Sequence, residues 1–223
     1  MKLKGKIFLF ILLTVTPLFS VTTITDYAAK RKWPANFGIY YLNQPPVYYA
    51  EDFYELYAKR NYYGESEINL NIIYMQGALK SPFRPAYKAL VPLHSKRIAL
   101  KYQNLLKMHM NLRILKDYLY LGRLYDMPKL YFYHKKEVDD LIKSLQFAEY
   151  YYKIANNYWT EVKKQAVNAF LISDVYIDLD NLEDEMNFIV TRRVDWQFDR
   201  IIKINLLKVQ DNLKKLKEFK NNN

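Results

Sequence analysis

The sequence predicts an all-α protein of stacked helical hairpins, arranged as a short repeat array or an irregular bundle, with a long C-terminal helix. From residue 129 to residue 223 the chain contains no glycine and no proline, and it is rich in residues that favour helices. No stretch alternates apolar and polar residues as paired strands do. The most strand-like patch, 172–179, is short and is explained more simply as a helix end followed by a connection.

Two shorter helices are expected first. One spans Val47–Tyr62, because it follows Pro46 and carries acidic residues in its first half, where the helix dipole favours them. The next spans Glu67–Leu79 and ends at a break, 81–85, that contains two prolines. The proline-containing segment 21–46 before them is expected to be an extended lead-in.

Two longer helices follow. Ser95 can cap a helix that runs to about Tyr125, because its hydroxyl can accept a hydrogen bond from the first turn. One face of this helix is apolar at Ile98, Tyr102, Leu105, Leu112 and Leu119. The segment from His134 to about Ser173 forms one long helix or two helices in series.

The C-terminal part is expected to contain a helix N-terminus with a cap, followed by a final helix. Asp180 and Glu183 have the spacing of a capping box, and the last helix ends at about Phe219. Apolar residues of that helix alternate spacings of four and three, at Ile202, Leu206, Val209, Leu213 and Leu216. We interpret this face as packing on its own domain; docking to a partner protein is the alternative.

The first twenty residues have the three-part pattern of a secretory signal peptide. Lys2, Lys4 and Lys6 precede an apolar run, and Ser20 is a small residue where cleavage can occur. The run is shorter than the ~20 residues of a membrane-spanning helix, although an uncleaved inner-membrane anchor is the alternative. We therefore expect an exported, periplasmic protein with a signal peptide (1–20), a lead-in (21–46), a single helical domain (47–220) and a disordered tail (221–223).

Composition argues against an enzyme. The 223 residues are 51% apolar and include 22 tyrosines but no cysteine, which excludes disulfides, thiol nucleophiles and thiolate metal sites. The three histidines lack metal-ligand spacing, and no serine-nucleophile or glycine-rich phosphate motif is present. We therefore expect no catalytic residue, cofactor site or metal site.

Two stretches resemble tetratricopeptide repeats, which are helix–turn–helix units of about 34 residues with aromatic, small and proline residues at fixed places. The first, 51–84, carries the pattern at Tyr54, Ala58, Tyr74, Gly77 and Pro82, but has Leu70 where alanine is usual. The second is split between Tyr118, Leu121, Gly122 and Tyr125 and, about fourteen residues too far along, Ala148, Tyr152 and Ala155. The small residues would let helices approach closely beside the aromatic rings. An unrelated helical bundle is the alternative.

As a whole, the chain resembles small exported proteins of spirochaetes. The shared features are a bias towards Lys, Ile, Asn and Tyr, an export signal, no cysteine and a repeat-like helical body. Several periplasmic helical-repeat proteins of spirochaetes build the collar around the flagellar motor. The resemblance implies a scaffold with a role in motility that binds other envelope or flagellar-motor proteins or further copies of itself.

Charge is segregated along the chain, whose net charge is +11. Residues 80–136 carry 13 basic and 2 acidic groups, whereas residues 137–191 carry 4 and 11. These blocks face either each other or a partner. Since nucleic acid is scarce outside the cytoplasm, we expect no nucleic-acid partner; the alternative to a scaffold is a binder of anionic cell-envelope polymer or lipid, in contact with the membrane surface. The expected basic interaction surface comprises Arg84, Lys88, Lys96, Arg97 and Lys101.

Overall fold

The computed structural model describes residues 47–126 and 137–222, all of which belong to one compact unit, Pro45–Asn223. The described residues form helices and no strand, so the predicted all-α fold with a long C-terminal helix is confirmed. The strand-like patch 172–179 is a connection between two helices. The predicted signal peptide and lead-in, 1–46, lie outside the described residues.

A short helical hairpin comes first. α3 (Ala50–Phe53) continues into a π-helical turn, η1 (Tyr54–Ala58), and α4 (Glu65–Lys80) returns beside them. The Asp52 carboxylate accepts hydrogen bonds from the backbone N–H groups of Tyr48 (3.0 Å) and Tyr49 (2.9 Å), which stabilises the start of α3. The first helical segment, 50–58, is shorter than the predicted helix, 47–62, and ends in a π-helical turn.

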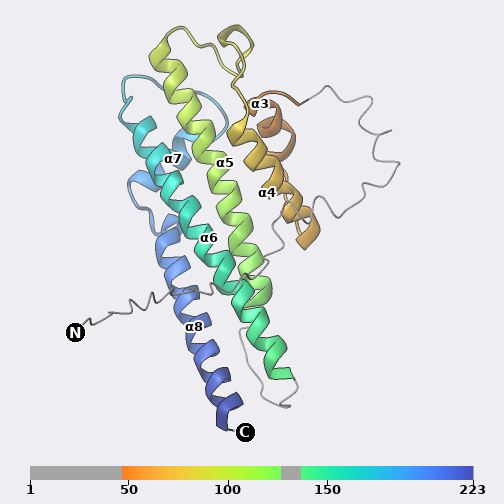
Figure 1. The fold of residues 1–223 in the computed structure, drawn as a ribbon. Coiled ribbons are helices and arrows are strands. Elements are labelled where there is room, and N and C mark those ends of the chain that lie inside the picture. Colours follow the sequence, from red (N-terminus) through yellow and green to blue (C-terminus); the bar gives the residue numbers. More distant parts are fainter. Residues whose placement is uncertain (1–46, 127–136, 223) are drawn as a thin grey trace, which may run out of the picture. The chain divides into compact units, whose positions relative to one another are not determined.

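Two long antiparallel helices, α5 (Lys96–Tyr125) and α6 (Val138–Phe170), form the centre of the unit (Figure 1). The Ser95 hydroxyl accepts a hydrogen bond from the Ile98 N–H at 3.1 Å, so the predicted cap of α5 is confirmed. A short 3₁₀ turn, η2 (Ala86–Lys88), lies in the connection that precedes α5. The core residues of α5 include Tyr102, Leu105, Leu112 and Leu119 from the predicted apolar face.

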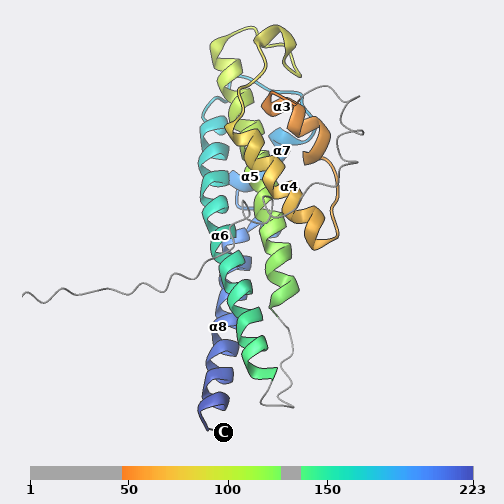
Figure 2. The same cartoon turned by 45° about the vertical axis from the view of Figure 1, so that its right-hand side comes forward.

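Two further helices pack on this pair. α7 (Leu182–Val190) lies against α5 and α6, and after the 3₁₀ turn η4 (Val194–Trp196) α8 (Phe198–Asn222) packs along α6 (Figure 2). Ile202, Val209, Leu213 and Leu216 are buried, so the predicted packing of this face on its own domain is confirmed. α8 also continues past residue 220, where we placed the end of the helical domain, and Lys220 pairs with Asp139 of α6 at 2.7 Å.

The predicted capping box before α7 is wrong. Asn181 is the N-cap residue, and Asp180 has a positive φ of 47°, which is an uncommon conformation for a residue other than glycine. The Asp180 carboxylate instead accepts a hydrogen bond from the Tyr54 hydroxyl at 2.5 Å and pairs with Lys59 at 2.8 Å. Contacts with the distant first hairpin therefore replace the local cap.

Candidate protein-interaction surface

The second set of predicted repeat residues lies in the interface between α5 and α6. Leu121, Gly122, Ala148 and Ala155 are buried there. A Cβ atom placed on Gly122 would overlap the Tyr152 ring, so glycine lets this ring lie directly on the α5 backbone. The Tyr152 hydroxyl donates to Asp126 Oδ2 at 2.9 Å, and burial raises the pKa of this hydroxyl, as does the bond to Asp126.

The first set of predicted repeat residues is also brought together, within the hairpin of α3, η1 and α4. Tyr54 and Ala58 are buried, and the Tyr74 ring stacks on the Tyr57 ring with centroids 4.1 Å apart. The Pro82 carbonyl accepts a hydrogen bond from the Ala50 N–H at 3.0 Å, which closes the hairpin. Gly77 differs from Gly122, because a Cβ there would lie 3.5 Å from the Phe53 ring, at ordinary contact distance.

Tyrosine and phenylalanine rings form a continuous strip along one side of the α5–α6 pair. We call it the tyrosine strip, and its members are Tyr118, Tyr125, Phe147, Tyr150, Tyr151 and Tyr158. Successive ring centroids are 5.6 to 6.1 Å apart, within the range of favourable aromatic contacts. The repeat pattern located only Tyr118 and Tyr125 among these six residues.

The tyrosine strip passes from the core to the surface. Tyr118 is only 2% exposed, whereas Phe147 and Tyr150 of α6 are 53% and 43% exposed. Two hydrogen bonds connect the strip to α4: the Tyr125 hydroxyl donates to Glu65 at 2.6 Å, and Gln76 donates to the Tyr158 hydroxyl at 2.8 Å. Phe147 and Tyr150 therefore contact the half-buried rings of Tyr125 and Tyr151, and Tyr151 in turn contacts the buried Tyr118.

The predicted basic surface is only partly present. The prediction is wrong for Lys101, which is buried. Its side chain is 4% exposed, pairs with Glu183 at 2.7 Å and donates a hydrogen bond to the Val175 carbonyl. Arg84 is partly buried between Asp52 and Glu55, and Arg97 is exposed but paired with Asp174 at 2.8 Å. Lys88 and Lys96 remain exposed, without an ion pair to any described residue.

Most of the chain from α5 onward matches the sequence model of a known family. A domain of unknown function (DUF8513) matches residues 100–219, which is more than half of the 223 residues. The chain belongs to the DUF8513 family. No curated protein and no solved structure matches it. The DUF8513 region includes all of α6 and α7 and most of α5 and α8, and therefore the whole tyrosine strip.

Polar contacts inside the DUF8513 region hold α7 to α5, and the charge pattern alone did not identify them. Besides the Lys101 pair, His109 Nδ1 lies 2.6 Å from Glu185 Oε2, and the Glu183 carboxylate accepts the Ile177 N–H at 2.9 Å. The Tyr54 and His109 rings also form a T-shaped contact, with centroids 5.4 Å apart. Part of the basic block thus faces part of the acidic block within the fold.

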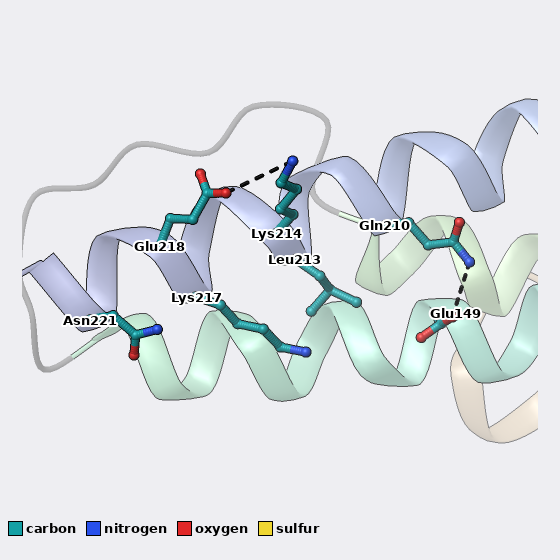
Figure 3. Close-up of a pocket in the computed structure, with 7 residues that line it drawn as sticks. All are labelled: Glu149, Gln210, Leu213, Lys214, Lys217, Glu218 and Asn221. Atoms are coloured by element: carbon teal, nitrogen blue, oxygen red, sulfur yellow. Dashed lines mark hydrogen bonds and ion pairs between the residues drawn. The ribbon is translucent and has the colours of Figure 1, made fainter.

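A shallow depression of about 400 Å³ also lies in the DUF8513 region, between α6 and the last turns of α8 (Figure 3). Gln210 Nε2 donates to Glu149 across it at 3.3 Å, and Leu213 lies between the polar side chains. Hydrogen bonds from Lys153 and Gln210, with the nearby Lys217 charge, hold the pKa of Glu149 below its usual value. The depression is a shallow seam between two packed helices, lined by Leu213 and by long polar side chains.

Residues 47–126 and 137–222 contain no group of three or more potential metal ligands. No helix within those same ranges is long and apolar enough to cross a bilayer.

Proposed function

We propose that this chain is a non-enzymatic scaffold that binds other proteins through the exposed end of the tyrosine strip. The observation that supports this proposal is the exposure of Phe147 and Tyr150 beside the half-buried rings of Tyr125 and Tyr151. Aromatic side chains in such a position offer a large contact area and lose little conformational entropy on binding, and for these reasons they are enriched at protein interfaces.

The proposed location of the scaffold is the periplasm, in an envelope assembly such as the flagellar-motor collar. The support is the signal-peptide pattern that ends at Ser20 and the resemblance to exported spirochaete proteins. Cleavage there lowers the net charge from +11 to +8. Mass spectrometry of the N-terminal peptide of the native protein tests this: a mature chain that begins at Val21 supports export with cleavage, and an intact Met1 supports the uncleaved anchor.

A pulldown from the solubilised cell envelope tests the binding proposal. The bait variant Phe147→Ala/Tyr150→Ala should reduce the recovery of specific partners about tenfold or more, because the few residues that dominate an interface cost about 2 kcal/mol or more each when truncated to alanine. Phe170→Ala is the matched control, since Phe170 lies on the same helix, outside the strip, and is 43% exposed, like Tyr150. Equal recovery by wild type and the double variant, with both folded, would refute the strip as the binding face.

A further inference from the structure

One end of the helical unit is formed by the 81–95 connection and the first turns of α5, with the 171–176 segment beside them. Both views of the ribbon place these segments at the same end (Figures 1 and 2). The Arg97–Asp174 ion pair of 2.8 Å and the hydrogen bond from Lys101 to the Val175 carbonyl link α5 to the second segment. We call this the loop end. It is separate from the tyrosine strip, which lies nearer the other end of α5.

The loop end is rich in basic residues, and two of its lysines have no ion-pair partner among the described residues. The sequence contains no Asp or Glu from Lys80 to Lys116. Carboxylates from other segments neutralise Arg84, Arg97 and Lys101, but Lys88 and Lys96 are exposed and form no ion pair with any described residue. The neighbouring acidic residue Asp174 is itself paired with Arg97. Two lysines at the loop end therefore face solvent without a counter-charge.

The same end exposes large apolar side chains. Tyr87, in the 3₁₀ turn η2, is 81% exposed, and its ring lies 5.7 Å from the Lys88 ammonium group. Leu100 on the first turns of α5 is 54% exposed, and Leu171 and Tyr176 are 69% and 71% exposed. Single exposed apolar residues are common on proteins. Their combination with unpaired lysines and a largely apolar loop is a more specific sign of a binding surface.

We propose that the loop end is a peripheral contact with an anionic lipid surface. Lysines are attracted to acidic head groups, while tyrosine and leucine side chains can enter the boundary between head groups and acyl chains. An anionic wall polymer could pair with the lysines but would leave Tyr87, Leu171 and Tyr176 in water. The apolar component thus favours lipid as the partner. This contact is additional to the proposed protein scaffold, and neither proposal depends on the other.

A site-specific fluorescent probe tests this proposal in the full chain. Because the sequence has no cysteine, Tyr87→Cys provides a single attachment point for an environment-sensitive dye. Ile204→Cys on α8 is the matched control, since Ile204 is exposed and apolar but lies away from the loop end. Vesicles with and without acidic phospholipid are then compared. Any binding through the apolar N-terminal segment is common to both labelled proteins, so only a difference between the two positions counts.

The expected result is a blue shift of the dye at position 87 with acidic vesicles, and little shift with neutral vesicles or at position 204. Lys88→Glu/Lys96→Glu should weaken this response about tenfold or more, since each lysine near an anionic surface adds to the attraction. Lys203→Glu/Lys217→Glu, which makes the same charge change on α8, should leave it unchanged. No shift at position 87, equal shifts at both positions, or a response to purified cell wall but not to vesicles would overturn the proposal.

Discussion

The close contact between Gly122 and Tyr152 makes the α5–α6 interface sensitive to a single methyl group. Gly122→Ala should lower the free energy of unfolding by about 1–3 kcal/mol, because the new Cβ overlaps a ring that buried neighbours hold in place. Gly77→Ala is the control: its Cβ fits at 3.5 Å from Phe53, and alanine favours the helix by up to about 1 kcal/mol. Urea denaturation measures both, and equal effects of the two substitutions would contradict the packing described.

A second residue, Asp117, should make stability depend on pH. Burial raises its pKa to about 6, against the opposing effects of Arg113 and the 2.6 Å hydrogen bond from Asn71. Because the folded protein holds this proton more tightly than the unfolded chain, its contribution to the free energy of unfolding falls by up to ~3 kcal/mol as the pH rises from about 4 to about 6.

Asp117→Asn removes this dependence. Asn71 Oδ1 is buried and has no hydrogen-bond partner in the described structure, and an amide at position 117 can donate to it. The variant should therefore gain stability relative to wild type between pH 4 and pH 6 and keep the gain above pH 6. Denaturation midpoints across that range measure it, with Asp140→Asn, at an exposed position, as the control. A difference from wild type that does not vary with pH would rule out Asp117 as the cause.

At the scale of elements, the docking of α7 on α5 depends on the buried pair of Lys101 and Glu183. Lys101→Met should cost about 3–5 kcal/mol of stability, because it leaves a buried carboxylate without its counter-charge. Lys101→Met/Glu183→Gln should be less damaging than the single change, since the amide still accepts the Ile177 N–H without carrying charge. Arg97→Met breaks an exposed pair and should cost less than about 1 kcal/mol. Additive losses in the double variant would contradict this account.

Local patterns in the sequence predicted the elements better than they predicted the contacts between them. The cap at Ser95 and the buried face of α8 follow from hydrogen bonding and helical periodicity within one segment, and both predictions are confirmed. Lys101 appeared to be a surface lysine because its partner, Glu183, is distant in the sequence. Asp180 appeared to be a cap for the same reason, since Tyr54 and Lys59 belong to the first hairpin.

The tyrosine strip shows the same difference between patterns within one helix and contacts between helices. The repeat pattern found Tyr118 and Tyr125, which lie seven residues apart on one side of α5. It missed the four strip residues of α6, which are Phe147, Tyr150, Tyr151 and Tyr158. The alignment of α6 beside α5 decides which of the 22 tyrosines meet, and that alignment depends on the packing of Tyr152 over Gly122. Sequence spacing can locate aromatic residues on one helix, but it does not specify contacts across two.

At the scale of the whole molecule, internal pairing changes the interpretation of the segregated charge. His109 with Glu185, Lys101 with Glu183 and Arg97 with Asp174 all join the basic block to the acidic block within one chain. The residues of the first two pairs are largely buried and are therefore not free to bind a partner in the folded protein, whereas Arg97 and Asp174 form an exposed pair. The exposed rings of the tyrosine strip are better placed for that role, because none of them must leave the core to make a contact.

Photo-crosslinking in the native cell tests this central claim most directly. A photoreactive phenylalanine analogue placed at Phe147 should give a discrete crosslinked species that contains another envelope protein, identified by mass spectrometry. The same analogue at Phe170 should give much less of it, although Phe170 lies on the same helix and is 43% exposed. A crosslinked protein that appears equally from both positions, or from position 170 alone, would contradict the claim that the tyrosine strip is the binding face.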